Sequence, residues 1–416
     1  YARSLGYMDW STQPDPFRIY RGAETITLPL ATDNATPPYH LLDDDLPSAP
    51  LLKESISQLL QFSMGLAAWK VSGESSWAVR CNASSGNLHP TEAYLILPPI
   101  LEEQEEKSAI FHYAPKSHAL EMLAEFNTSF WETLPKGSFI VGLSSIPWRE
   151  VWKYGERAFR YTQLDGGHAW QAFVVSAKML GWKITRLDSA SHDDISTLLG
   201  LTQKNRFFES EIADMLFVVS SEEIEPSTSI DTLIENIPLI FEGIANKLSP
   251  NMQKWDIIPA IENATSTVEI PQKKTSKSKV TRTPTRESKD IVLNRRSIHV
   301  TQKELSLITK EQFHVLLKSV VQSQDSKENS THLALFVHRV EEYESGLYIL
   351  IRNEKDKDDL VTQMKGEFEW KETELDNLYL LQKNDFKMIS KAISCTQDIA
   401  SDGAFSLGML CNFSEQ

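Results

Sequence analysis

The segment of residues 80–94, Arg-Cys-Asn-Ala-Ser-Ser-Gly-Asn-Leu-His-Pro-Thr-Glu-Ala-Tyr, constrains the fold more than any other part of the chain. It places an arginine, a turn of small residues and the start of a strand close together. Residues 84–86, Ser-Ser-Gly, allow the backbone to approach a ligand closely enough for N–H groups to donate to it. Arg80 can bind an anionic oxygen with its planar guanidinium, and residues 93–97 have the composition of a buried strand. The segment predicts a rigid edge that holds an anionic ligand, or else a simple strand connection.

A second segment lies at residues 152–171, Trp-Lys-Tyr-Gly-Glu-Arg-Ala-Phe-Arg-Tyr-Thr-Gln-Leu-Asp-Gly-Gly-His-Ala-Trp-Gln. Its second half enters the clearest helical pattern of the chain, residues 165–180, with apolar residues at helical spacing and Gly181 after the last turn. Small residues in the first half of this helix allow close packing against it.

Together the segments carry three motifs in order: R-x-x-x-S-x-G-x-x-x-P from residue 80, K-Y-G-x-R-x-x-R-Y from residue 153 and G-H-x-x-Q from residue 167. In this the chain resembles the flavin-dependent nitroreductase superfamily, and within it the SagB-type dehydrogenases that include azoline oxidases of ribosomal peptide biosynthesis. The resemblance covers about residues 48–220, and a weaker second copy starts near Arg295. It implies an α+β fold with a sheet flanked by helices, built as two fused copies that form an internal pseudo-dimer.

The resemblance also implies a cofactor, FMN, and a set of site residues. Lys153 and Tyr154 match the Lys-Tyr pair that the azoline oxidases are thought to use in deprotonating substrate. Dehydrogenation needs such a base while flavin N5 takes the hydride, and desolvation can lower the pKa of a lysine into a useful range. No metal is implied. The residues expected around the flavin are Arg80, Ser84, Ser85, Gly86, Asn87 and His89 in the turn, Gln171 on the long helix, and Arg295, Arg296 and Ser297 at the start of the second copy.

Each assignment has a structural alternative. Arg80 can form an ion pair with a nearby carboxylate, and Arg295 to Ser297 can be a charged helix N-terminus, which would itself favour an anion. Lys153 can be a solvated surface residue with Tyr154 in the core. Adjacent residues do not share a helix face, so a joint role for the pair needs a turn at Gly155. His168, three residues before Gln171, can bind the flavin or a buried carbonyl.

The order of patterns predicts four parts: a proline-rich arm over residues 1–50, a first nitroreductase-like domain over 51–222, a helix and a Lys/Ser/Thr-rich linker over 223–290, and a second domain over 291–416 that is incomplete within the given sequence. Trp10, Phe17 and Tyr20 are the apolar anchors of the arm. Helices are expected at 51–65, 120–126, 165–180, 233–247, 301–319 and 396–413, and strands at 93–97, 109–113, 138–143, 211–220, 333–340 and 346–351.

Composition limits the kinds of partner that we expect the chain to bind. The chain has 416 residues, 41% of them hydrophobic, and a net charge of −15. This charge disfavours a nucleic-acid partner, because phosphate binding uses clustered Lys and Arg. No apolar run approaches the roughly 18 residues of a membrane span. Three cysteines without metal-ligand spacing indicate neither a zinc site nor a disulfide framework and fit a reducing compartment such as the cytoplasm.

The sequence therefore predicts an FMN-dependent oxidoreductase that moves a hydride between flavin N5 and a small or peptide-derived substrate. Between residues 320 and 333 the second copy lacks the turn motif, so one flavin per chain is expected. Two rivals remain: an NAD(P)H-dependent nitro or quinone reductase with a structural Lys-Tyr pair, and a flavin-free scaffold for protein interaction. An internal pseudo-dimer would remove the usual reason for subunits to pair, which is compatible with a monomer.

Overall fold

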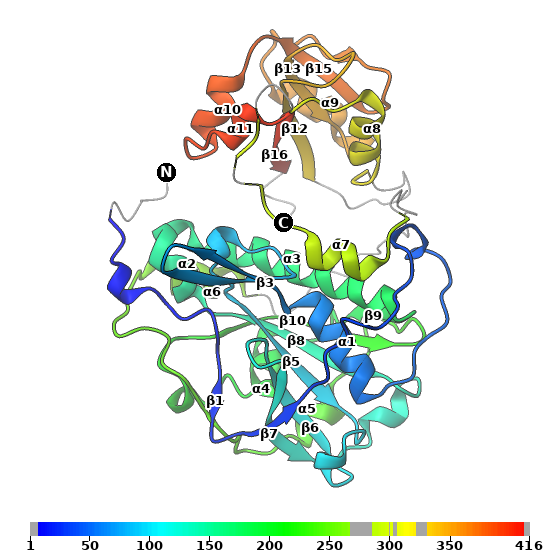
Figure 1. Cartoon of the computed structure of the whole chain (residues 1–416), viewed down its shortest axis with the longest axis vertical. Helices are drawn as coiled ribbons and strands as arrows, with labels where there is room; N and C mark the ends of the chain where they lie inside the picture. The colour runs from blue at the N-terminus through cyan, green and yellow to red at the C-terminus, as the bar shows by residue number, and fades with distance from the viewer. Residues whose placement is uncertain (1–6, 267–284, 299, 303–305, 322–330, 412–416) are drawn as a thin grey trace. The chain divides into compact units, whose positions relative to one another are not determined.

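A computed structural model describes residues 7–266, 285–298, 300–302, 306–321 and 331–411. The chain divides into two compact units (Figure 1). The first contains Tyr1–Gln272 and Thr285–Arg295, and the second contains Lys273–Pro284 and Arg296–Gln416. Most of the Lys/Ser/Thr-rich linker expected from the sequence lies outside the described residues.

The first unit is built on a seven-stranded sheet in which every pair of neighbours is antiparallel. Residues alternate between its two faces with the period of a strand, and apolar side chains occupy both, so both faces must be covered. The strands, in spatial order, are β2 (Glu24–Thr27), β7 (Ala119–Phe126), β6 (Ser108–Ala114), β5 (Thr91–Leu97), β8 (Phe139–Ser145), β10 (Ile212–Ser220) and β9 (Lys183–Arg186).

Helices cover both faces of this sheet. On one face α1 (Lys53–Ser63) and α3 (Ala158–Met179) pack on Leu95, Val141 and other strand residues. On the opposite face α4 (His192–Leu198) and α5 (Asp231–Glu235) enclose a second core. The smaller helices α2 (Pro147–Tyr154), α6 (Ile257–Thr265) and α7 (Ser288–Asn294) complete the unit. The expected sheet flanked by helices is confirmed.

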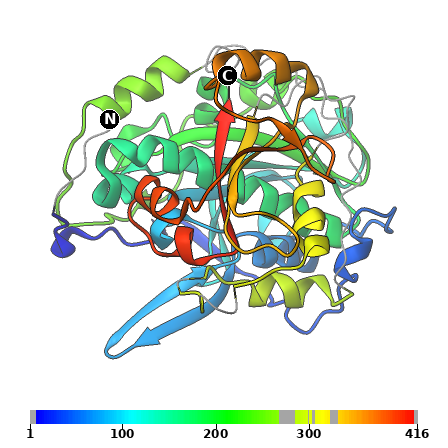
Figure 2. The ribbon, with the colours of Figure 1, turned by 90° about the horizontal axis from the view of Figure 1, so that it is seen from above.

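The N-terminal arm joins this architecture. Its strand β2 is the edge of the large sheet, and β1 (Tyr20–Arg21) pairs with β11 (Ile244–Ala245). Phe17 and Tyr20 are buried as expected of anchors, but Trp10 is 62% exposed. Strands β3 (Leu66–Ser72) and β4 (Ser75–Arg80) form a separate hairpin that projects from the unit, drawn in light blue in Figure 2.

The second unit has its own five-stranded antiparallel sheet and its own cores. Two units with separate sheets agree with the expected two fused copies. In spatial order the strands are β14 (Lys371–Glu372), β15 (Leu378–Lys383), β13 (Gly346–Leu350), β12 (Thr331–Val337) and β16 (Phe405–Cys411), and the helices are α8 (Lys310–Lys318), α9 (Lys357–Gln363), α10 (Lys387–Ile393) and α11 (Ile399–Asp402).

Two helix predictions are wrong because strand pairing overrides local propensity. Residues 120–126 lie in β7, which is paired on both sides and buried along most of its length. Of the predicted helix at residues 396–413, the part that the structure describes, up to Cys411, contains the short α11, after which β16 pairs with β12.

Two other predicted helices are shorter than expected. Within residues 233–247 only the end of α5 is helical, and the chain then enters β11. In residues 301–319 the helix is α8, which begins at Lys310 after the N-cap Thr309 and is fixed there by a capping box between Thr309 and Gln312. Residues 303–305 lie outside the described part of the chain.

Candidate functional site

The turn after β4 is held in an unusual backbone conformation by its own side chains. Gly86 has φ 62°, and Asn87 and His89 also have positive φ, which non-glycine residues adopt rarely. The Ser84 hydroxyl accepts from the His89 backbone N–H at 2.8 Å, and the Asn87 amide donates to the Ala78 carbonyl at 2.8 Å. Gly86 itself is exposed. The turn is therefore a fixed element that presents backbone at the surface of the unit.

Lys153 and Tyr154 reach this turn from the end of α2. A β-carbon built on Gly86 would lie 2.6 Å from the Tyr154 Oη and 2.9 Å from the Lys153 Nζ. The helix ends at Tyr154, and Gly155 follows with φ 56°. Both side chains are half-buried. The side chains of these two adjacent residues both lie at Gly86, because the helix ends at Tyr154. This end of the helix at Gly155 is the condition that a joint role for the pair needs.

Asp165, in the first half of α3, binds the same turn. Its Oδ1 accepts from the Ser85 backbone N–H at 2.9 Å and from the Ser85 hydroxyl at 3.0 Å. Burial raises the pKa of this carboxyl, although hydrogen bonds from Ser84 and Ser85 oppose the rise. The backbone N–H of Ser85, expected to donate to a ligand, donates to Asp165 in this structure.

Glu150 is a further residue that sequence reasoning missed. It lies on α2 one turn before Tyr154, it is fully buried, and neither carboxyl oxygen has a hydrogen-bond partner among the described residues. Burial raises its pKa well above the usual value, and the negative charge of Asp165 adds to the rise. The available signal was a single acidic residue between Trp148 and Val151 on the buried side of a helix.

Arg80 is less accessible than the sequence suggested. Only 1% exposed, its guanidinium donates to the main-chain carbonyls of Pro16 and Thr91. Its Nε is buried without a partner among the described residues. Burial lowers its pKa to about 10, opposed by the charge of Glu92. In this structure Arg80 binds carbonyls rather than an anionic group, because the arm runs across it.

The remaining turn and helix residues divide into buried and exposed ones. His89 is buried, and desolvation together with the charges of Arg80 and Arg149 holds its pKa well below the usual value, so its ring is neutral. His168 and Gln171 are both exposed on α3. A flavin contact of Gln171 stays a prediction.

Arg295, Arg296 and Ser297 do not begin a helix. Arg295 follows the last residue of α7, so this segment is at a helix C-terminus, where the dipole favours a cation rather than a phosphate. The Arg295 Nη2 donates to the Cys81 carbonyl at 3.3 Å. Arg295 therefore contacts the residue that directly follows Arg80 in the chain. Arg296 and Ser297 are grouped with the second unit, and their expected meeting with the turn stays a prediction.

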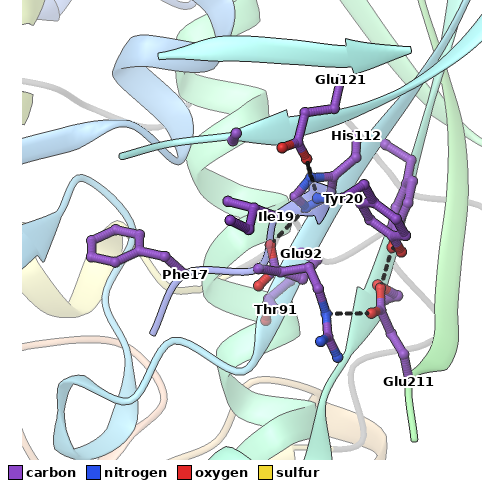
Figure 3. Close-up of polar contacts among 12 residues, drawn as sticks. Phe17, Ile19, Tyr20, Thr91, Glu92, His112, Glu121 and Glu211 are labelled. Atoms are coloured by element: carbon purple, nitrogen blue, oxygen red, sulfur yellow. Dashed lines mark hydrogen bonds and ion pairs between the residues drawn. The ribbon is translucent and has the colours of Figure 1, made fainter. Parts of the chain in front are cut away.

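A buried polar network fixes the arm within the first unit (Figure 3). Arg18 lies between Glu209 and Glu211, with nitrogen–oxygen distances of 3.5 and 3.3 Å. The Tyr20 backbone N–H donates to Glu121 at 3.0 Å, and the Tyr20 and Tyr94 hydroxyls are 2.6 Å apart. All of these side chains are buried, so the arm is anchored by charge as well as by apolar contact.

A groove of about 460 Å³ lies between the arm, the projecting hairpin and the turn. Aromatic side chains from the arm and the hairpin form much of its wall. Asn87 and Leu88, which also line the groove, belong to the turn after β4. The aromatic residues are Trp10, Phe17, Trp69 and Trp77.

In the part of the chain that the structure describes, no three or more His, Cys, Asp or Glu side chains gather as a metal site. Among the same residues, no helix combines the length and apolar character that crossing a membrane requires.

Comparison with known structures identifies the fold. A presumed nitroreductase from Anabaena variabilis superposes with a TM-score of 0.65 over 99% of this chain and 83% of that chain, at 16% identity. The microcin synthetase McbBCD complex of E. coli, with truncated pro-MccB17 bound, matches at 20% identity over 49% of this chain and 77% of that chain, but its TM-score of 0.34 supports no argument. No family model and no curated protein matches the sequence. With its two α+β units, the chain has a nitroreductase-like fold.

Proposed function

We propose that this chain is an FMN-dependent oxidoreductase of the SagB-type dehydrogenase kind, acting on a small or peptide-derived organic substrate. The observation that carries the proposal is the meeting of Lys153 and Tyr154 with the turn at Gly86. Residues from two motifs, distant in sequence, come together at an exposed backbone point beside an aromatic groove. A nitroreductase-like fold supports redox chemistry as the reaction class, although fold alone does not establish activity.

The residues present fit a phosphorylated flavin in two respects. Arg80 has a buried nitrogen without a partner, and Arg295 donates to the carbonyl of the residue that follows Arg80. We assign these two arginines to the phosphate, and Ser84, Asn87 and Gln171 to the remaining polar groups of FMN. When bound, the flavin supplies the group that accepts or gives the hydride.

The protein side chains then handle the proton. The Lys153 amine, once neutral, takes the proton that the substrate loses as its hydride departs, and the Tyr154 hydroxyl orients the reacting group. Asp165 holds the turn in place through Ser85, so its role is positioning. The groove next to Asn87 gives a substrate with an apolar or aromatic part a path to this point.

The first test is the visible absorption spectrum of the purified protein, with the released cofactor identified by mass. FMN at about one per chain supports the proposal, and a colourless protein after reconstitution supports the scaffold alternative. Arg80→Ala and Arg295→Ala are expected to lower the flavin content, whereas Arg21→Ala, at an exposed position on β1, is the matched control. Unchanged flavin content in both site variants would contradict the assignment.

Lys153→Met separates the two enzymatic readings. Loss of dehydrogenation with retained flavin supports the base assignment. The opposite result would be an unaltered protein that shows no dehydrogenation and a Lys153→Met variant that keeps full activity in NAD(P)H-driven reduction of nitro or quinone compounds. That result would favour the reductase, in which this lysine is structural.

A further inference from the structure

Arg149 lies on α2 one turn before Lys153, and its side chain is completely buried. Its Nε donates to the Asp15 carbonyl at 3.0 Å, and its Nη1 donates to the His89 carbonyl at 2.7 Å and to the Glu92 carboxylate. These three acceptors belong to the arm, to the turn after β4 and to β5. One guanidinium therefore joins the helix that carries the proposed base to three other elements of the first unit.

The two carbonyls that Arg149 binds belong to the two segments that border the candidate site. His89 lies at the end of the turn, and its backbone N–H is bound to the Ser84 hydroxyl near the start of the turn. Asp15 lies in the wall of the aromatic groove. The turn and the groove wall are thus held by the same side chain.

A main-chain hydrogen bond already connects the start of α2 to the end of the turn. The Ile146 backbone N–H donates to the Pro90 carbonyl at 2.9 Å. That bond lies at the N-cap of α2, whereas Arg149 is located about one helical turn closer to Lys153. Residues four apart are neighbours on one helix face. The main-chain bond fixes where the helix begins, and Arg149 holds its later part.

Glu92, which pairs with Arg149, is itself held by a buried chain of charged groups. His112 lies between Glu92 and Glu121 in Figure 3, with nitrogen–oxygen distances of 3.0 and 2.8 Å. Glu121 also accepts from the Tyr20 backbone N–H in the arm. Two cations alternate with two carboxylates, because donation from both ring nitrogens requires the imidazolium form. Each member is therefore oriented by its neighbours.

A simpler explanation is that Arg149 only compensates the buried charge of Glu92. Burial opposes ionisation of Glu92, but the charge of Arg149 and the hydrogen bond from His112 lower its pKa to about 2. That role uses one of the three bonds that Arg149 makes. It does not explain why the other two bonds go to the segments that border the site, since a lysine would supply the same charge.

We propose that Arg149 is a positioning residue, which holds the turn after β4 and the groove wall at a fixed distance from Lys153 and Tyr154. It acts through these groups and does not touch substrate. The inference rests on the proposed function, because it assigns Arg149 to the same site.

Arg149→Lys tests this geometry without flavin or substrate. Lysine keeps a positive charge beside Glu92 but carries it on one nitrogen, so it cannot reproduce the planar fork onto both carbonyls. Backbone hydrogen exchange is measured at His89 and Asp15, whose own N–H groups are hydrogen-bonded in the unaltered protein. We expect exchange to become about tenfold faster or more, as follows from loss of a hydrogen bond to a charged group. Unchanged exchange at both residues would overturn the proposal.

The matched control is Arg206→Lys. Arg206 is 4% exposed and also donates to main-chain carbonyls outside the turn and the groove wall, those of Gly200, Glu242 and Gly243. The two substitutions should lower the Tm by similar amounts, and exchange in the turn and at Asp15 should change only in Arg149→Lys. Equal acceleration there in both variants would indicate a general loss of stability and would also overturn the proposal.

Turnover provides a second readout. Arg149→Lys should keep its flavin and lower kcat about 10²-fold, the size expected when reacting groups are misplaced by about 1 Å, whereas Arg206→Lys should keep its kcat. Gly86→Ala displaces the Lys153 and Tyr154 side chains at the same turn. The combined loss in Arg149→Lys/Gly86→Ala should therefore be smaller than the product of the two single losses. Losses that multiply would show that Arg149 acts elsewhere.

A second variant covers the case in which Arg149→Lys does not fold. Arg149→Gln/Glu92→Gln removes two opposite buried charges together and is used in the same measurements. A protein without flavin refutes the proposed function, whereas the exchange data still decide whether Arg149 holds the turn and the arm. Retained flavin with unchanged exchange and unchanged kcat refutes the positioning role alone, so the two failures are distinguishable.

Discussion

Substitution of Gly86 by alanine tests the central geometric claim, that the turn and the Lys153–Tyr154 pair form one site. The new β-carbon would lie 2.6 Å from the Tyr154 Oη and 2.9 Å from the Lys153 Nζ, whereas ordinary contacts begin at 3.4 Å. Both atoms are ends of flexible side chains, so they can retreat. The expected consequence is displacement of these two groups rather than unfolding.

The magnitude has two parts. Alanine at φ 62° costs about 1–2 kcal/mol of backbone strain, which lowers the Tm by a few degrees. Movement of Tyr154 and Lys153 by a large fraction of an ångström is a separate effect, and misplacement of a catalytic group by about 1 Å can reduce turnover about 10²-fold. Stability should therefore change little and turnover greatly.

Gly73 provides the matched control. It lies in the turn between β3 and β4 with φ 59°, and a β-carbon there meets nothing within 4 Å. Gly73→Ala carries similar backbone strain without the clash. Calorimetry on both variants should give similar losses of Tm, and turnover should fall only in Gly86→Ala. Equal turnover in the two variants would refute the reasoning, because the Lys153–Tyr154 pair would then not act at the turn.

Two further predictions concern the buried network. Arg18→Met removes the cation that pairs with Glu209 and Glu211, and it should lower the free energy of unfolding by about 3–5 kcal/mol in denaturant titrations. The control, Arg21→Met at an exposed position, should change the free energy of unfolding by less than about 0.5 kcal/mol. Equal effects of the two substitutions would show that the Arg18 ion pairs do not stabilise the fold. Burial disfavours the charged form of His112, but the hydrogen bonds that its ring nitrogens donate to the Glu121 and Glu92 carboxylates outweigh this effect and raise the pKa to about 9. Since this folded-state pKa is above the unfolded value of about 6.5, the stabilisation is complete below about pH 6.5 and is lost as the pH rises through about 9. Denaturant unfolding across this range should show the decline in the unaltered protein and a flatter profile in His112→Gln; parallel profiles would contradict the assignment.

Part of the fold could be predicted from local patterns. The apolar periodicity of residues 165–180 identified α3, although that helix begins at Ala158. Residues 93–97 were identified as a strand because an apolar run after a proline turn is a strong local signal. In contrast, residues 120–126 favour a helix by local propensity and become β7 because β2 and β6 pair with them on either side. Such pairing depends on segments far away along the chain and leaves no local pattern.

The candidate site also has some features that local patterns predict and others that depend on distant segments. The turn at Gly86, where positive φ favours glycine, and the end of α2 at Gly155 follow from the local sequence, because both depend on the conformations of adjacent residues. Contacts between distant segments bring Lys153 and Tyr154 to Gly86, place the Asp165 carboxylate at the Ser85 N–H, and cover Arg80 with the arm. The same packing buries Glu150, whose carboxyl oxygens have no hydrogen-bond partner among the described residues. These are contacts between elements whose relative positions follow from sheet register and core packing, and they depend on the whole unit rather than on any short segment.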